Sequence, residues 1–352
     1  MKENKVVIIG SGIAGMTAAI YLKRGGLEPI IIENNIVEKS WSILDHSKRY
    51  LVITDSNLLK TYDELIYQIP NLITTIALKP GELAKSIEVY QKIITALTKL
   101  GVKRNDVIIA FGGGVIGDLV GFVACTYLRG IDFIQIPTTL IAQIDASIGG
   151  KCGIDFINKN DIGTFYHPSQ VIIDPVLLKS LPKNEFLHGL SELIKYGFIK
   201  DASIINDVQR FTLPFKPDVL LSLIERAVKI KIQLTQKDEF DLSIRRLLNF
   251  GHTYAHIIER KSKYKISHGE AVAIGMYYEL EGTEYQQVLL DLIQKYQLTN
   301  QLEKWNISYA ADLKTDKKAT STKITMVELE AIGKAKLVDR SILWTHLEKT
   351  LD

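Results

Sequence analysis

The chain has 352 residues, of which 46% are hydrophobic and 24% are charged, and its formal net charge at pH 7 is +3. This composition favours a soluble globular protein that is long enough for two ordinary domains. The net charge is too small to indicate nucleic acid as a partner.

The apolar run Val6–Leu22, which follows Lys2 and Lys5, has the character of a signal peptide. It is shorter than the roughly 20 apolar residues that a membrane span needs, and glycines interrupt it, so we expect no membrane segment. Only two cysteines occur, Cys125 and Cys152, and neither has the spacing of a metal motif. No disulfide framework is implied, and we expect a cytoplasmic protein.

The first half of the chain alternates short apolar segments, rich in β-forming residues, with helical segments. Helices are predicted over Glu82–Leu100 and Gly117–Tyr127. Alternation of this kind favours a mostly parallel sheet with helices on its faces. The predicted strands are Val6–Ile9, Ile30–Ile32, Tyr50–Ile53, Val107–Phe111, Phe133–Ile136 and Val171–Ile173.

From about Leu181 onward, long helical patterns replace the alternation. The second half is therefore predicted to be all-α. Its predicted helices are Glu185–Phe198, Pro217–Gln236, Arg245–Lys261, Gly269–Glu284 and Tyr285–Tyr296.

A first glycine-rich motif, Gly10–Gly15, follows a predicted strand, and Glu33 ends the next one. This is a dinucleotide-binding pattern, and it resembles the amino-terminus of flavin-dependent disulfide reductases. Nothing after Glu33 continues a flavin domain, and a redox Cys-x-x-Cys is lacking. Our hypothesis is that Lys5–Ile9 pairs with the strand Ile30–Ile32 and that the glycine loop binds nothing.

A second motif, Gly112–Gly114, follows the strand Val107–Phe111. Glycines let the backbone approach a pyrophosphate, and the amino-terminus of the next helix favours negative charge. Thr138 and Thr139 close another strand, where their hydroxyls can reach the same ligand. These residues predict a phosphate or dinucleotide site.

Four polar side chains follow one another at helical spacing late in the chain. Arg245, Asn249, His252 and His256 are separated by intervals of four, three and four residues. If a helix begins at Arg245, these side chains line one of its faces. An ordinary surface helix does not align a guanidinium, an amide and two imidazoles, so this face is a candidate site.

A candidate metal site combines residues of separate segments. Glu192 and Lys195 lie three residues apart on one predicted helical face, and His268 follows His252 after a break in the helical pattern. A glutamate and two separated histidines form a plausible three-ligand set with positions left open for substrate.

The ordered motifs together resemble the 3-dehydroquinate synthase family, from about Glu28 to the carboxyl terminus. The resemblance implies an α/β NAD-binding domain over residues 1–178, atypical in its first 27 residues, and a helical metal- and substrate-binding domain over 179–352. The motifs are Gly112–Asp118, Tyr127–Gly130, Pro137–Leu140, Asp145–Lys151, Lys159–Gly163, Leu181–Pro182, Glu192–Lys195, Leu248–Thr253 and His268–Met276.

The reaction that the resemblance implies belongs to the shikimate pathway, toward chorismate and the aromatic amino acids. A keto sugar acid phosphate, DAHP, becomes 3-dehydroquinate and phosphate. NAD oxidises a ring hydroxyl transiently, phosphate leaves by β-elimination, the hydride returns, and an intramolecular aldol reaction closes the carbocycle. The net redox change is zero.

The resemblance also assigns roles to individual residues. Glu192, His252 and His268 match the family's zinc ligands, although such a set also accepts cobalt or iron. Arg129 matches an arginine that reaches the neighbouring site of a homodimer, and one of Lys317 and Lys318 is expected to cover the site. The other matches to catalytic or substrate-binding positions are Asp145, Lys151, Asn160, Lys195, Lys231, Arg245, Asn249 and His256.

The residues matched to NAD contacts come mainly from the first half. Asp55 ends a strand, where an acid can accept hydrogen bonds from both ribose hydroxyls. The full set is Asp55, Asn57, Glu82, Lys85, Gly113, Gly114, Asp118, Thr138, Thr139, Lys151, Lys159, Ser180, Leu181 and Glu185.

The chain departs from the family pattern at Ala146, Cys152, Asp241 and Ala255. The alternatives are another sugar-phosphate cyclase, a metal- and NAD-dependent polyol dehydrogenase, and a flavin oxidoreductase. Arg245 is suited to bind a carboxylate, which neutral sugar phosphates lack, and this favours the synthase. Lys151, Lys195 and Arg129 are suited to a substrate phosphate, which argues against the dehydrogenase.

Overall fold

The computed structural model describes residues 6–9, 28–302, 305 and 323–341. The chain divides into two compact units. The first is Met1–Pro182 with Lys216–Gln236, and the second is Lys183–Phe215 with Lys237–Asp352. No helix among the described residues is both long enough and apolar enough to cross a membrane.

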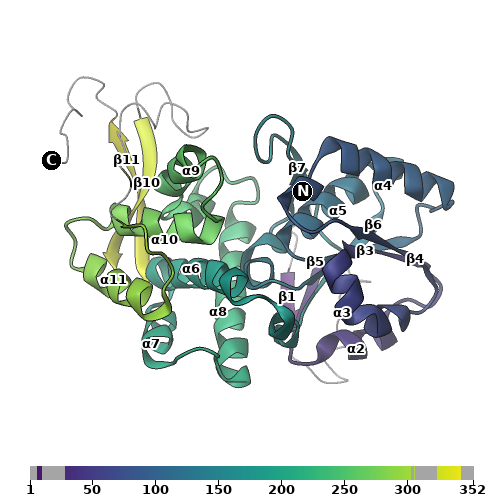
Figure 1. Ribbon diagram of the computed structural model, residues 1–352, viewed down its shortest axis with the longest axis horizontal. Helices are drawn as coiled ribbons and strands as arrows, with labels where there is room; N and C mark the ends of the chain where they lie inside the picture. The colour runs from purple at the N-terminus through teal and green to yellow at the C-terminus, as the bar shows by residue number, and fades with distance from the viewer. Residues whose placement is uncertain (1–5, 10–27, 303–304, 306–322, 342–352) are drawn as a thin grey trace. The chain divides into compact units, whose positions relative to one another are not determined.

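The first unit is built on a parallel sheet whose strands run in the order β1-β2-β9-β6-β5-β3-β4 (Figure 1). Every pairing in this sheet is parallel, which confirms the predicted α/β class. The strands are β1 (Val6–Ile9), β2 (Glu28–Ile32), β3 (Tyr50–Asp55), β4 (Leu72–Leu78), β5 (Val107–Gly112), β6 (Asp132–Pro137) and β9 (Gln170–Ile173).

Alternating side chains of this sheet enter two separate cores. Tyr50 and Val52 of β3 pack with helices α2 (Ile36–Ser40) and α3 (Ser56–Tyr67). Leu51 and Ile53 of the same strand pack with α4 (Ile87–Lys99) and α5 (Gly114–Thr126). Figure 1 shows these two helix pairs on opposite sides of the sheet. Burial on both faces explains why the strands are continuously apolar.

The amino-terminal strand joins the sheet as its edge. β1 pairs in parallel with β2, with Val6 opposite Glu28, and β2 pairs in parallel with β9. The expected pairing of the first strand is therefore confirmed. The motif Gly10–Gly15 lies outside the described residues, as do Lys317 and Lys318.

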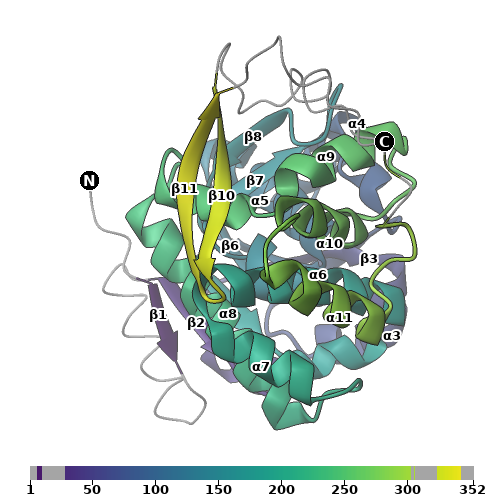
Figure 2. The ribbon, with the colours of Figure 1, turned by 90° about the vertical axis from the view of Figure 1, so that its left-hand side faces the viewer.

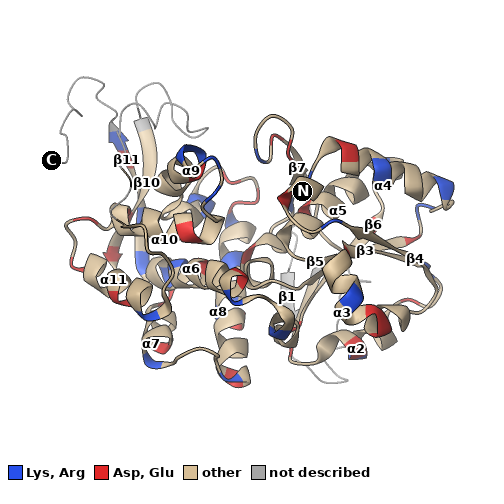
Figure 3. Ribbon diagram, viewed as in Figure 1, with Lys and Arg blue, Asp and Glu red and all other residues tan. Residues whose placement is uncertain are grey.

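Smaller elements complete the first unit. An antiparallel hairpin joins β7 (Lys151–Ile154) to β8 (Ile162–Phe165). A turn of π-helix spans Ala142–Ala146, and the long helix α8 spans Pro217–Lys237. Positive and negative residues occur together along α4 and α8 (Figure 3), in keeping with the small net charge.

The second unit is mainly helical, which confirms the predicted fold class, but it also holds an antiparallel hairpin (Figure 2). Ile324 and Met326 of the hairpin pack on Ile257 of α9, and polar Thr325 between them pairs with Asp339. The prediction of a purely helical second half is wrong in this respect. Polar and apolar residues alternate in the last two strands with a period of two, which is typical of β-strands. The elements are α6 (Lys183–Lys200), α7 (Ala202–Arg210), α9 (His252–Lys261), α10 (His268–Glu279), α11 (Tyr285–Tyr296), β10 (Lys323–Ala331) and β11 (Lys334–Ser341).

The predicted continuous helix Arg245–Lys261 is wrong. A 3-10 turn over Ile244–Asn249 ends before Gly251, whose φ of 78° is left-handed, and α9 begins only at His252. Arg245 and Asn249 therefore do not share a helical face with His252. The chain bends here because glycine tolerates this conformation.

A close approach of α10 accompanies the bend. A Cβ atom placed on Gly275 would lie 2.0 Å from the carbonyl oxygen of Gly251. Only a glycine at position 275 leaves room for the backbone that turns into His252.

Replacing Gly275 by alanine is expected to lower the free energy of unfolding by about 1–3 kcal/mol or more, since the added methyl group overpacks two backbones. Thermal and urea unfolding of the variant test this. An unchanged midpoint would contradict the close packing of α10 against the bend.

Candidate functional site

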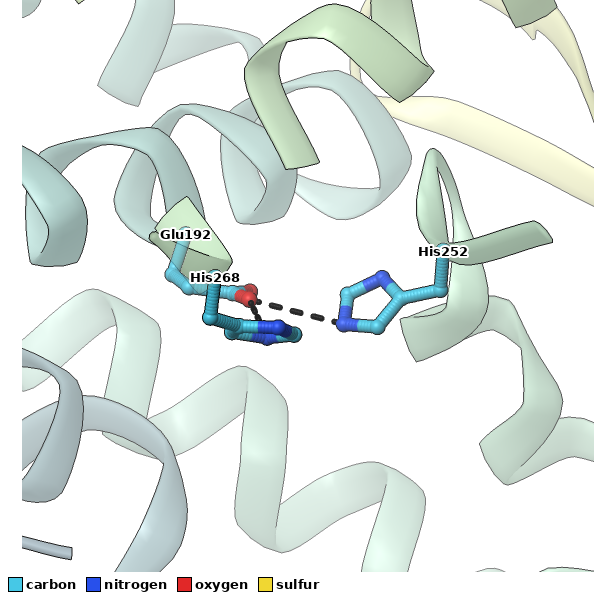
Figure 4. Close-up of side chains that lie close together, drawn as sticks. All are labelled: Glu192, His252 and His268. Carbon is cyan, nitrogen blue, oxygen red and sulfur yellow. Dashed lines mark hydrogen bonds and ion pairs between the residues drawn. The ribbon is translucent and has the colours of Figure 1, made fainter. Parts of the chain in front are cut away.

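Three side chains of the second unit converge on one point (Figure 4). Glu192 comes from α6, while His252 and His268 are the first residues of α9 and α10. Glu192 Oε1 lies 3.2 Å from His268 Nε2 and 3.5 Å from His252 Nε2. One potential ligand atom from each residue lies within 4.8 Å of the other two. A carboxylate and two imidazoles at this spacing are a donor set for a divalent metal ion.

The far nitrogen of each imidazole also has a partner. His252 Nδ1 lies 3.1 Å from the carbonyl oxygen of Phe250, and His268 Nδ1 lies 3.4 Å from Glu259 Oε1. When Nδ1 carries a hydrogen toward such an acceptor, the neutral ring keeps its lone pair on Nε2. Both rings are therefore oriented with Nε2 toward Glu192.

Lys195 supplies a buried positive charge on the other side of Glu192. Its Nζ lies 2.5 Å from Glu192 Oε2, and the side chains of Lys195 and Glu192 are only 1% and 2% exposed. Burial alone would raise the pKa of Glu192, but Lys195 and His252 hold that pKa well below its ordinary value. Glu192 is thus ionised and able to act as a ligand.

The pKa values of the two histidines are shifted in opposite directions. Burial lowers the pKa of His252, and Glu192 only partly opposes this. Burial would also lower the pKa of His268, but hydrogen bonding to Glu192 and Glu259 raises it to about 10. A metal ion that binds His268 Nε2 therefore takes the place of a proton.

In the first unit, Asp145 pairs with Lys231. Asp145 lies in the turn of π-helix, and its Oδ1 accepts a hydrogen bond from Lys231 Nζ on α8. The Lys231 side chain is 8% exposed and that of Asp145 is 21% exposed. π-Helical turns are frequent at functional sites, and this one presents a carboxylate beside a buried cation.

Several of the residues matched to NAD contacts lie at the carboxyl edge of the parallel sheet. Strands β3, β5 and β6 are neighbours, and Asp55, Gly113 and Thr138 lie at or just after their carboxyl ends. A Cβ on Gly113 would lie 2.9 Å from Thr139 Cγ2, so a larger residue would crowd the Thr139 side chain there. This is the edge at which parallel sheets bind nucleotides, and the bare backbone fits a pyrophosphate.

Asp55 has a structural role in addition to the predicted one. Its Oδ1 accepts hydrogen bonds from the backbone N–H groups of Asn57 at 2.8 Å and Leu58 at 3.1 Å, so it caps α3. Asn57 is thereby held in the first turn of that helix.

Lys85 links a predicted NAD contact to a predicted substrate contact. Its Nζ lies 2.6 Å from Asp118 Oδ2 and also donates to Asn160 Oδ1. The backbone N–H of Asn160 donates to Asp155 Oδ1 at 2.8 Å. Lys85 is 4% exposed, whereas Asn160 is exposed, so the buried ammonium group holds a network that extends to the surface of the first unit.

The remaining predicted residues of the first unit are more dispersed. Ser180 Oγ accepts a hydrogen bond from the Tyr62 hydroxyl at 2.8 Å. Arg129 has a left-handed φ of 62° just before Gly130. The others lie in α5 (Gly114), after β6 (Thr139), in a 3-10 turn (Glu82), at the start of β7 (Lys151), in the β7–β8 turn (Lys159) and at the start of the segment before α6 (Leu181).

In the second unit, Arg245 is held by its own loop. Its backbone N–H donates to Asp238 Oδ2 at 3.1 Å, and its Nη1 donates to the carbonyl oxygen of Glu239 at 2.6 Å. The His256 ring lies 5.7 Å from that of His252, measured between centroids. Asn249 ends the 3-10 turn, and Glu185 on α6 lies 3.5 Å from His188 Nδ1.

Two residues that contact this machinery were not foreseen from the sequence. Glu259 approaches His268, and Asp238 accepts hydrogen bonds from the backbone of Leu242, Ser243 and Arg245. Glu259 follows His252 by seven residues, two helical turns, and that spacing was an available signal.

Replacing Lys195 by methionine is expected to lower the free energy of unfolding by about 3–5 kcal/mol, because Glu192 stays charged and buried without its cation. The double variant Glu192→Gln/Lys195→Met, measured by urea unfolding, should recover much of this loss. Additive losses would show that the two side chains do not depend on each other.

Known families match the chain in three segments. The 3-dehydroquinate synthase N-terminal family matches residues 75–188, and the 3-dehydroquinate synthase C-terminal family matches residues 189–327. An FAD binding domain family matches residues 5–42. The FAD binding domain match ends at residue 42, and the synthase match begins at residue 75.

Curated relatives cover most of the chain. A 3-dehydroquinate synthase from Clostridium kluyveri is 41% identical over 83% of this chain and 86% of its own length. One from Shouchella clausii is 40% identical over 89% of this chain and 92% of its own length.

Solved structures share the fold. A 2-epi-5-epi-valiolone synthase from Streptomyces hygroscopicus, with NAD+ and Zn2+ bound, has a TM-score of 0.81 at 27% identity and covers 89% of this chain and 92% of its own. A 2-deoxy-scyllo-inosose synthase, complexed with carbaglucose-6-phosphate, NAD+ and Co2+, has a TM-score of 0.77 at 23% identity. The match covers 89% of this chain and 93% of the synthase chain.

Proposed function

This chain belongs to the 3-dehydroquinate synthase family of carbon–oxygen lyases, and we propose that it converts DAHP into 3-dehydroquinate and inorganic phosphate. The observation that carries this proposal is the convergence of Glu192, His252 and His268 beside the buried Lys195. A lyase of this family needs a divalent ion at such a donor set.

We assign two cofactors from the groups that the residues can hold. Glu192, His252 and His268 would hold Zn2+ or Co2+, and the carboxyl edge with Gly113, Gly114 and the two threonines would hold NAD. When bound, the ion polarises a substrate hydroxyl and NAD accepts and returns its hydride. The neighbours solved with NAD+ and Zn2+ or Co2+ support this assignment.

Charged residues of both units suit an anionic substrate. Arg245 presents a planar guanidinium, which recognises a carboxylate through two hydrogen bonds. Lys151, Lys195 and Lys231 supply point charges for phosphate and hydroxyl oxygens, and Asn160, Asn249 and His256 add hydrogen-bonding groups. We propose that these seven side chains bind DAHP.

The Asp145–Lys231 pair is suited to moving a proton. The ion pair with Lys231 fixes the position of the Asp145 carboxylate, and a carboxylate can act as a general base toward a hydroxyl that is being oxidised. We propose Asp145 as the group beside the reacting hydroxyls, with Lys231 holding it in place.

The assembly that we propose is a homodimer in the cytoplasm. In this assembly Arg129 reaches the phosphate in the neighbouring subunit's site. Its backbone, left-handed at Leu128 and Arg129, is held in an uncommon conformation, which is frequent where a side chain has a functional task.

The purified protein, supplied with DAHP, NAD and zinc, should release one phosphate for each 3-dehydroquinate formed and accumulate no NADH. Malachite green, 3-dehydroquinate and 340 nm absorbance assays measure the three quantities. NADH accumulation would indicate a polyol dehydrogenase. Turnover of a neutral sugar phosphate in place of DAHP would indicate another sugar-phosphate cyclase.

Replacing His268 by alanine should remove the metal and the activity and leave the fold largely intact, because one of three ligands is lost. Metal analysis and circular dichroism test this. His46→Ala is the matched control, since His46 is exposed and has no role in the proposed site. Full zinc content and activity in His268→Ala would refute the ligand set.

A further inference from the structure

Glu259 is a buried carboxylate for which the proposed reaction gives no role. It lies near the carboxyl end of α9, two helical turns after His252, and only 6% of its side chain is exposed. A buried carboxylate requires a partner of opposite charge or several hydrogen bonds. One of its partners is the ring of His268, whose Nδ1 lies 3.4 Å from Glu259 Oε1.

We propose that Glu259 is a positioning residue of the metal centre. It holds the imidazole of His268 through Nδ1–H, so that Nε2 faces Glu192 and the ion. The inference rests on the proposed metal site, and it adds a residue that does not itself touch the ion. Histidine ligands commonly depend on such a partner for their tautomer and orientation.

The two histidines differ in how firmly their surroundings orient the imidazole ring. His252 follows the Gly251 bend directly, and its Nδ1 meets a backbone carbonyl only two residues away, that of Phe250. Its side chain is 12% exposed, whereas that of His268 is 36% exposed. His268 is also the first residue of its helix, which the side chain of Ser267 caps. The cap fixes the backbone, whereas side-chain contacts orient the His268 ring. The more exposed ring has the carboxylate partner.

Charge at the cluster supports the same assignment. The negative charge of Glu192 is offset by Lys195, 2.5 Å from its Oε2. Glu259 adds a second negative charge, separated from the ion by one imidazole ring. A carboxylate acceptor at Nδ1 makes Nε2 a stronger donor to a cation than a neutral acceptor does. Removal of this charge should therefore weaken metal binding more than it changes the fold.

Zinc affinity of the full chain, measured by competition with a chromogenic chelator, tests the proposal. Glu259→Gln keeps the size of the side chain and a hydrogen-bond acceptor but removes the charge. We expect it to bind zinc about 10–100-fold more weakly than the parent, the usual loss for such partners. The far-ultraviolet circular dichroism spectrum of the metal-free variant should match that of the parent, which shows that the fold is kept.

The matched control is Glu270→Gln. Glu270 is a partly buried glutamate on α10, and its Oε1 accepts a hydrogen bond from Thr299 at 2.8 Å in place of a histidine. Its zinc affinity should equal that of the parent. In cobalt-loaded protein, the visible d–d absorption should change in Glu259→Gln and stay unchanged in Glu270→Gln, because only Glu259 orients a ligand.

The outcomes separate this inference from the metal site itself. A parent that binds no zinc, or a His268→Ala variant that binds it as tightly as the parent, would refute the metal site. If the parent binds zinc through His268 and Glu259→Gln binds it equally well, the positioning role is wrong. A loss of metal-free stability with unchanged zinc affinity and cobalt spectrum would likewise assign Glu259 to packing alone.

Discussion

The buried Glu192 carboxylate contacts one cation, Lys195, and two imidazoles, and the second unit depends on these contacts. A carboxylate that is 2% exposed must be compensated, and Lys195, one helical turn along α6, provides this at 2.5 Å. The other oxygen faces two rings that begin different helices. Three chain segments are thus drawn to one point, and the point has the donor chemistry of a divalent metal site.

Two glycines allow the helices that carry His252 and His268 to approach each other closely. The left-handed Gly251 ends the 3-10 turn and starts α9 at His252, and Gly275 lets α10 approach that bend. The helical spacing of Arg245, Asn249 and His252 therefore rested on a wrong geometry, and their shared role stays a prediction. A regular periodicity cannot reveal a break whose cause is a backbone contact with a distant helix.

The sheet of the first unit could be read from the sequence because burial on both faces leaves continuous apolar runs. β4 was missed because it is an edge strand whose residues Leu72–Leu78 are half-exposed and include two threonines. The hairpin β10–β11 was missed although its polarity alternates, since the helical pattern before it dominated. The metal ligands were proposed from their donor types and matched by the family resemblance, whereas Glu259 was overlooked although it lies two helical turns after His252.

X-ray absorption at the zinc edge of the loaded protein tests the central claim most directly. The account predicts a first shell of nitrogen and oxygen atoms at about 2.0–2.2 Å, with two imidazoles that contribute to the outer scattering. Variants that lack either His252 or His268 should no longer retain the ion, so this zinc-edge signal should disappear. A sulfur shell at about 2.3 Å, which only a cysteine would supply at this metal, or a spectrum unchanged in both variants, would contradict it.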